Sequence, residues 1–215
     1  MTADRWIRRV FKPLIFAAGL LPAALLTWRA LTDRLSANPI TDITHETGIW
    51  ILRFVLITLA ITPLRQLTGW YWLIKFRRML GLFAFFYGCL HFGTYMVLDH
   101  FFDFGTIVED IALRPFVTVG FAGFVLMIPL AVTSTAAMVR RLGGRNWRRL
   151  HRLIYLTAIA GVVHYWWGVK ADILRPQIYA AIAAVLLGYR IVTAIPKRSQ
   201  RTALPAGASS SLPSN

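Results

Sequence analysis

The chain has 215 residues, of which 57% are hydrophobic and 15% are charged, and its mean hydropathy is +0.56. This composition is too apolar for an ordinary soluble domain. The net charge of +15 would suggest nucleic-acid binding in a soluble protein. Here, however, the basic residues form short groups between apolar runs of 14 to 25 uncharged residues, which are typical of membrane helices. We therefore predict a protein of the lipid bilayer with no nucleic-acid partner.

Six apolar segments remain when the sequence is cut at its charged residues, and a helix of about 20 residues crosses the hydrocarbon core. The second segment is the weakest because Arg53 interrupts it, and the sixth crosses only if Arg190 reaches an interface. The sequence predicts an all-α fold, a polytopic membrane helical bundle with six transmembrane helices. The predicted spans are residues 10–30, 47–64, 76–98, 115–138, 152–169 and 174–195.

The two ends of the chain complete the domain prediction. Basic residues before the first span resemble the start of a secretory signal, but no convincing cleavage site follows, so we interpret this span as an uncleaved first helix. The end of the chain is rich in Pro, Ser and Ala and has no apolar periodicity, which predicts disorder. We expect a six-helix domain at 1–195 and a disordered cytoplasmic tail at 196–215.

The basic residues also predict the orientation. If the N-terminus is cytoplasmic, 18 of the 24 Lys and Arg residues fall on the cytoplasmic side and five on the other, with Arg53 inside a span. All acidic residues except Asp4 fall on the outer side. Because cytoplasmic loops are enriched in Lys and Arg, we predict a multi-pass protein with both termini in the cytoplasm.

Cysteine chemistry contributes little. Cys89 is the only cysteine, which excludes an intramolecular disulfide and a thiolate metal cluster. No C-x-x-C-H motif is present, so haem is not attached covalently as in c-type cytochromes. The five histidines are then the main candidate metal ligands.

Topology places two of the histidines at a similar depth. His151 begins the fifth span on the cytoplasmic side, and His164 lies 13 residues further, or about 20 Å along a helix. His91 lies near the outer end of the third span, so His91 and His164 share the outer leaflet. Two imidazoles on facing helices are what axial ligation of a b-type haem requires. The alternative is that each histidine merely bonds a neighbouring helix.

His151 has no histidine partner at its own depth. Fourteen residues before His91, on nearly the same helix face, stands Arg77. Arg77 has four interpretations: a haem propionate partner, a neighbour of a five-coordinate iron, an unusual ligand, or an ordinary cytoplasmic anchor. On an ideal helix His151 and His164 point about 140° apart. Two stacked macrocycles can be rotated, so the directions need not agree, although a local bend or overwinding would bring them closer.

Several stretches resemble one known family closely. They are FRRMLGLF at 76–83, LHFGTYM at 90–96, W-R-R-L-H-R-L-I-Y at 147–155 and VHYWWG at 163–168. Together they are similar to the MsrQ (YedZ) family of haem-binding membrane subunits, which is related to the transmembrane domains of ferric reductases and NADPH oxidases. The resemblance covers all six predicted spans and excludes the tail.

The resemblance implies an electron-transfer subunit of the bacterial inner membrane rather than the catalytic methionine sulfoxide reductase itself. It would carry electrons from the quinol pool through haem b, one or two per chain, to MsrP, a periplasmic molybdenum-dependent reductase that repairs oxidised methionines. FMN is a further cofactor associated with the family. By motif match the haem-iron ligands are His91, His151 and His164, and Arg77 stands where related oxidases have a fourth histidine.

Other charged residues acquire candidate roles from that expectation. Arg53 could pair with a propionate of the outer haem, or simply pack within the helix bundle. The outer loops could dock a soluble partner through Asp99, Asp103, Glu109 and Asp110.

Two alternative functions remain open from the sequence. One is another cytochrome-b-type reductase subunit, such as a ferric reductase. The other is a small transporter lined by His and Arg, although neither internal repeats nor matching broken helices support it.

Overall fold

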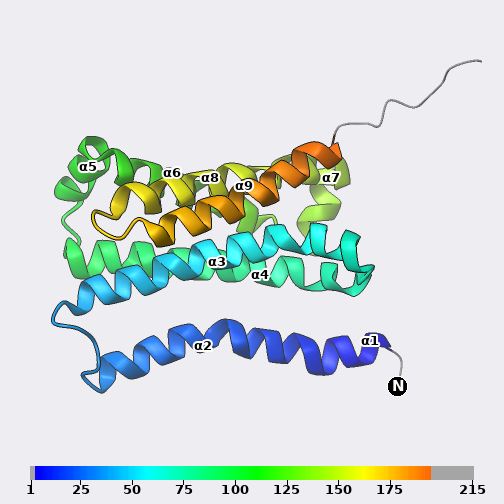
Figure 1. Cartoon of the computed structure of the whole chain (residues 1–215), viewed down its shortest axis with the longest axis horizontal. Coiled ribbons are helices and arrows are strands. Elements are labelled where there is room, and N and C mark those ends of the chain that lie inside the picture. Colours follow the sequence, from blue (N-terminus) through cyan, green and yellow to red (C-terminus); the bar gives the residue numbers. More distant parts are fainter. Residues whose placement is uncertain (1–2, 195–215) are drawn as a thin grey trace, which may run out of the picture.

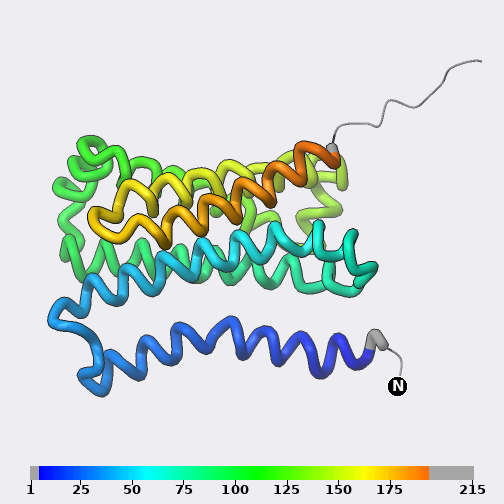
Figure 2. Tube along the Cα trace, viewed as in Figure 1, coloured from blue at the N-terminus to red at the C-terminus, as the bar shows by residue number. Residues whose placement is uncertain are grey.

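The described part of the chain, residues 3–194 of a computed structural model, is helical and contains no strand. The helices alternate in direction along a common axis (Figures 1 and 2). Short π-helical turns at Ile7–Phe11 and Tyr95–Asp99 and a 3₁₀ turn at Tyr71–Leu73 extend the longer helices. The α-helices are α1 (Ala3–Trp6), α2 (Lys12–Leu31), α3 (Pro39–Thr68), α4 (Ile74–Thr94), α5 (Phe104–Leu113), α6 (Pro115–Val132), α7 (Ala136–Leu150), α8 (Leu153–Gly168) and α9 (Leu174–Ala194).

Five helical segments of the described chain are long and apolar enough to cross a membrane. The sixth predicted span corresponds to α9, whereas the fifth corresponds to α8, which has 16 residues. Sixteen residues extend about 24 Å, less than the hydrocarbon thickness of about 30 Å. The all-helical membrane fold is confirmed, and the count of six spans is not. The qualifying segments are Ile7–Leu31, Pro39–Thr68, Tyr71–Asp99, Pro115–Val132 and Leu174–Thr193.

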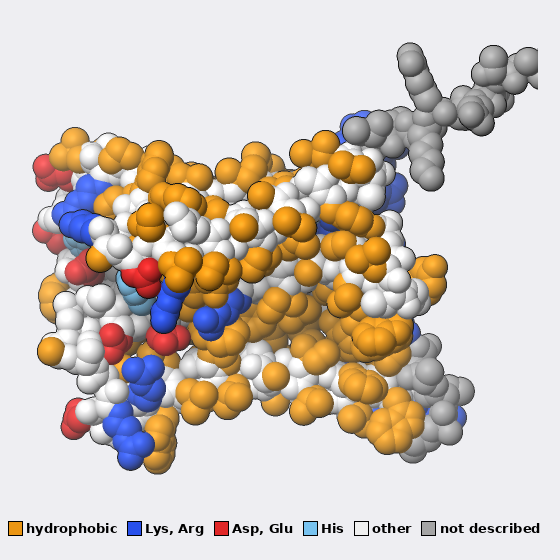
Figure 3. Space-filling model, in the orientation of Figure 1, with side chains coloured by type: hydrophobic (Ala, Val, Ile, Leu, Met, Phe, Trp, Pro, Cys, Tyr) orange, Lys and Arg blue, Asp and Glu red, His pale blue; other side chains and the backbone are white. Residues whose placement is uncertain are grey.

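The two ends of the bundle carry opposite charges. The start of α1, the α3–α4 turn, α7 and the end of α9 lie at one end, which we call the basic end (Figure 1). The α2–α3 loop, α5 and the α8–α9 loop form the other, the acidic end. Figure 3 shows the acidic side chains gathered at the acidic end, where Lys and Arg side chains lie among them, and hydrophobic side chains over the middle of the visible face. The separation predicted from the sequence is therefore present in the fold.

The predicted fourth span, 115–138, is too long. Helix α6 ends at Val132, because the hydroxyl of Thr133 donates to the Pro129 carbonyl at 2.6 Å and Thr135 starts a new helix as its N-cap. The new helix, α7, and the amphipathic α5 were both missed by the hydropathy analysis, since neither is apolar on all sides.

His151 does not begin the fifth helix, contrary to the prediction. It caps the C-terminus of α7, and α8 starts at Leu153. The 140° angle calculated for a continuous helix therefore does not apply, because a turn separates His151 from the helix that carries His164.

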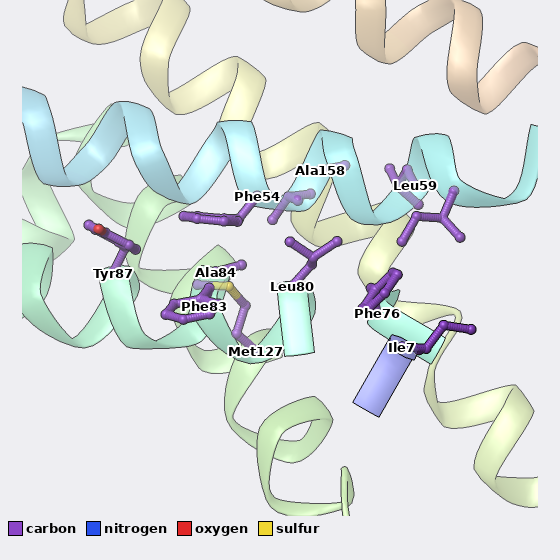
Figure 4. Packing of buried hydrophobic residues seen from close by; sticks show 12 residues of the cluster. Ile7, Phe54, Leu59, Phe76, Leu80, Phe83, Ala84, Tyr87, Met127 and Ala158 are labelled. Carbon is purple, nitrogen blue, oxygen red and sulfur yellow. The ribbon is translucent and has the colours of Figure 1, made fainter. Parts of the chain in front are cut away.

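Aromatic side chains of α3 and α4 form the centre of the core (Figure 4). Phe54 stacks between Phe83 and Tyr87, with ring centroids 5.3 and 5.5 Å away. Tyr87 also binds the backbone of α2, since its hydroxyl donates a hydrogen bond to the Gly19 carbonyl and accepts one from the Ala23 amide. The hydroxyl thus bridges a main-chain hydrogen bond next to Pro22.

The predicted tail at 196–215 lies outside the described residues.

Removal of that bridge should loosen α2. In Tyr87→Phe the Gly19 carbonyl and Ala23 amide lose their partner, and we expect a loss of about 1–2 kcal/mol in unfolding free energy. Equilibrium unfolding in mixed micelles measures the change. Tyr71→Phe, at an exposed tyrosine of the basic end, is the matched control and should be neutral; equal losses in both variants would contradict the bridge.

Candidate functional site

Two histidines predicted to share a depth do meet in the structure. His91 from α4 and His164 from α8 lie near the acidic end, with ring centroids 6.1 Å apart and ring planes at 82°. Both line one cavity of about 310 Å³, within the range of about 300–1,000 Å³ typical of cofactor sites. Most of the remaining lining is apolar, including Val55, Phe124 and Met127. His45 is a third imidazole in the lining, and His91 and His164 are the two whose rings meet.

Backbone carbonyls fix the protonation of both rings. Nδ1 of His91 lies 3.0 Å from the Thr44 carbonyl oxygen, and Nδ1 of His164 lies 2.6 Å from that of Phe116. A carbonyl oxygen only accepts, so each Nδ1 carries the proton and donates it. Each Nε2 then keeps its lone pair and has no hydrogen-bond partner within the described residues. Metal-binding histidines commonly have this arrangement.

Each imidazole rests against a glycine four residues after the carbonyl that it contacts. In a helix the side chain at position i+4 lies over the residue at i, so a glycine there leaves the carbonyl uncovered. A Cβ at Gly48 would lie 3.1 Å from Cε1 of His91, and one at Gly120 would lie 2.5 Å from Nδ1 of His164. We call the pairs Thr44/Gly48 and Phe116/Gly120 the histidine seats.

A polar network closes the cavity toward the acidic end. Asp110 of α5 is buried and accepts from the Tyr95 hydroxyl at 2.9 Å, while Arg114 Nε lies 2.6 Å from its other oxygen. His100 Nε2 lies 3.7 Å from the same carboxylate. These contacts tie α5 to the end of α4, and they place Asp110, Arg114 and Asp99 in the cavity wall.

The third predicted ligand, His151, lines a separate cavity of about 270 Å³ together with Arg77. Its ring stacks on Trp147 at 3.9 Å, and its Nε2 lies 3.1 Å from the Thr133 hydroxyl. Because that hydroxyl donates to Pro129, it accepts from Nε2, which leaves Nδ1 of His151 with the lone pair. Burial, and secondarily the charge of Arg77, lowers the pKa of His151 to about 4. The imidazole is therefore neutral at physiological pH.

Arg53 is the predicted site residue that the structure places elsewhere. Its Nε donates to the Tyr179 hydroxyl at 2.9 Å, and its guanidinium lies 4.6 Å from the centroid of the Trp50 ring. Neither cavity is lined by Arg53. Sequence reasoning in turn missed the histidine seats, since nothing in the sequence distinguishes Gly48 and Gly120 from the other glycines.

The donor set limits what the first cavity can hold. Within the described residues no group of three or more His, Cys, Asp or Glu side chains is arranged to hold a metal ion. A bare zinc ion takes three or four protein ligands, and the described residues of this cavity do not supply that number. Two imidazoles suffice where a macrocycle supplies the remaining ligands, as haem does.

Comparison with known proteins gives the class first. Residues 47–162, which contain His91 and His151 and end two residues before His164, match the family model described as ferric reductase like transmembrane component. The match spans more than half of the chain, so the protein is a ferric-reductase-like transmembrane protein.

Curated relatives then give the particular family. A protein of Herminiimonas arsenicoxydans is 55% identical over 197 residues, covering 91% of this chain and 90% of its own length. Relatives from Ralstonia nicotianae and Azospira oryzae are 54% and 52% identical, covering 85% and 86% of this chain and 85% and 79% of their own lengths. All three are named protein-methionine-sulfoxide reductase heme-binding subunit MsrQ. The chain belongs to the MsrQ family. No solved structure matches it.

A methyl group at the seat of His164 should disturb the site. In Gly120→Ala the new Cβ would clash with the imidazole, and overpacking of this kind costs about 1–3 kcal/mol. We expect a lower unfolding free energy by that amount. Gly188→Ala, in α9 with open space around it, is the control and should be neutral or stabilising.

Proposed function

We propose that this chain is a b-type haem subunit that carries electrons from quinol across the bacterial inner membrane to MsrP, a periplasmic molybdenum-dependent methionine sulfoxide reductase. The pairing of His91 with His164 is the observation that carries the proposal. Relatives named as heme-binding subunits of the protein-methionine-sulfoxide reductase support the cofactor and the system.

The residues of the first cavity fit haem. His91 and His164 would hold the haem iron, since their ring centroids lie 6.1 Å apart and the backbone carbonyls leave both Nε2 atoms free. The Gly48 and Gly120 seats hold both rings with Nε2 unprotonated, and most of the remaining wall is apolar. When bound, haem supplies a one-electron redox centre whose potential depends on these ligands and on burial.

The second cavity is the proposed place of a second haem b, with His151 as a ligand. The Thr58 hydroxyl in its wall is buried and has no partner within the described residues, which favours a polar ligand there. Arg77 lines the same cavity and provides a cation for a carboxylate. Because His151 Nε2 contacts Thr133, ligation through Nε2 requires the ring to release that hydroxyl.

The orientation follows from the charges of the two ends. With α8 as a short sixth span, we propose a six-helix domain at 1–195, with both termini and the basic end in the cytoplasm. The acidic end is then periplasmic. Asp99, Asp103 and Glu109 are exposed there, and Asp99 also lines the cavity that holds His91 and His164. Complementary charge would orient MsrP on this surface. FMN belongs to the proposal through the family resemblance alone.

Two other functions compete with this proposal. A ferric reductase subunit would use the same histidine pair with a different electron acceptor. A small transporter would be colourless and would move its substrate across liposomes, and the histidine seats argue against it because they prepare both Nε2 atoms for a metal.

Histidine substitutions test the cofactor. His91→Ala and His164→Ala should each remove the haem of the first cavity, measured as the haem-to-protein ratio of purified protein. His151→Ala should lower a ratio of two to one and leave the first cavity loaded. Tyr71→Phe, at an exposed residue outside both cavities, is the control. Protein that is produced with an ample supply of haem and still shows no haem absorbance after purification would contradict the proposal.

Reduction by quinol tests the donor. Haem-loaded protein in nanodiscs should show reduced-state absorbance bands after addition of ubiquinol under anaerobic conditions. Addition of purified MsrP and methionine sulfoxide should then reoxidise the haem, because its electrons pass to MsrP, and methionine sulfoxide should be consumed. Reduction only by a flavin reductase with NADH would overturn the quinol assignment and leave haem binding intact.

A further inference from the structure

Three arginines from three helices lie at the basic end, and within the described residues none of them forms an ion pair with an acidic side chain. Arg65 of α3, Arg77 of α4 and Arg190 of α9 are all half-buried, and Arg65 and Arg190 both act on Arg77 as like charges. Every ion pair between two described side chains lies instead at the acidic end. Like charges held together inside a membrane protein are costly unless an anion joins them.

Two of the arginines present buried donors that the protein leaves unused. The Nε atoms of Arg65 and Arg190 are buried and have no acceptor within the described residues. The terminal nitrogens of Arg190 bond the Tyr155 hydroxyl at 3.3 Å and the Leu59 carbonyl at 3.1 Å, which hold the guanidinium in place. Arg65 lies 5.9 Å from the centroid of the Tyr71 ring. The two cations are therefore positioned by neutral groups, and the Nε–H groups of both have no acceptor within the described residues.

The depth of the three arginines matches that of lipid phosphates. Arg65 and Arg77 each lie three residues from a helix end at the α3–α4 turn, and Arg190 lies four residues before the end of α9. One helical turn is about 3.6 residues, so all three lie about one turn inside the bundle. This is where the hydrocarbon core meets the headgroups. Exposed aliphatic side chains such as Leu64 and Val192 accompany them on the same helices.

The cluster is distinct from the second cavity. Arg77 lines that cavity, but Arg65 and Arg190 do not. A cofactor carboxylate inside the cavity would meet Arg77 and Arg78, and neither Arg65 nor Arg190 lines its wall. An anion shared by all three arginines must instead approach from the ends of α3, α4 and α9, which the lipid headgroups surround.

We infer that Arg65, Arg77 and Arg190 bind the phosphate group of an anionic phospholipid at the basic end of the bundle. Guanidinium groups bind phosphate oxygens through paired, charge-assisted hydrogen bonds, and basic pockets between membrane helices on the cytoplasmic side hold anionic headgroups in other proteins. The bound lipid would neutralise the cluster and join α3, α4 and α9 beside Arg77.

Lipid-dependent stability tests the site. The full-length, haem-loaded protein is delipidated in a neutral detergent, and its Tm is measured with added phosphatidylglycerol, cardiolipin or phosphatidylcholine. Anionic lipid at about 100 times its Kd should raise the Tm by about 5 °C, and phosphatidylcholine should not. Inorganic phosphate at the same concentration should give less than half of the shift, because it lacks acyl chains. An equal shift with phosphatidylcholine would overturn the proposal, and an equal shift with inorganic phosphate would assign the site to a free anion.

Substitutions separate the cluster from the other basic residues. Arg65→Gln and Arg190→Gln should each remove most of the shift, and Arg190→Lys should keep part of it because the charge remains without the planar fork. Arg140→Gln, at an exposed arginine of α7 at the same end, is the control and should retain the shift. If Arg190→Gln fails to fold, Arg65→Gln still decides, since the side chain of Arg65 makes no hydrogen bond within the described residues. A lower haem ratio with an unchanged lipid shift would contradict the site and leave haem binding established.

Discussion

The hydrogen bond from a histidine ring to a backbone carbonyl is the interaction on which the candidate site depends. A helical carbonyl normally lies beneath the side chain four residues ahead, and Gly48 and Gly120 remove that cover. Thr44 and Phe116 can then accept from His91 and His164 without any break in α3 or α6. Each ring gains a fixed tautomer, a fixed direction and a free nitrogen. Without the seats, the same two histidines would be adaptable polar residues in an apolar bundle.

The matched depth of His91 and His164 was predictable, because depth depends only on the rise per residue and on the charge pattern that sets each direction. Their facing directions were not, since these depend on how α4 and α8 rotate against their neighbours. Arg53 shows the same limit, because its partner, Tyr179, comes from a helix 126 residues later in the chain. His151 was misplaced because hydropathy cannot detect the turn between α7 and α8.

The two cavities differ in how completely the protein prepares them. In the first, both imidazoles have a carbonyl partner and a free Nε2. In the second, Nε2 of His151 is engaged by Thr133, the Thr58 hydroxyl has no partner within the described chain, and Arg77 stands where a histidine would complete a pair. A cavity of this kind depends more on its occupant for its final arrangement. The proposed function therefore rests on the first cavity. The second cavity bears only on whether the chain binds one haem or two.

The histidine seats have a consequence for assembly. Each ring is carried by one helix and held by another, so α4 depends on α3, and α8 depends on α6. A displacement of any of these four helices along its axis by one residue would move a glycine away from its imidazole and cover the carbonyl. The cofactor pocket would then be lost while every helix remained intact. Cofactor retention thus becomes a check on the register of the whole bundle, and a chain that has inserted but not packed correctly is distinguishable by its colour.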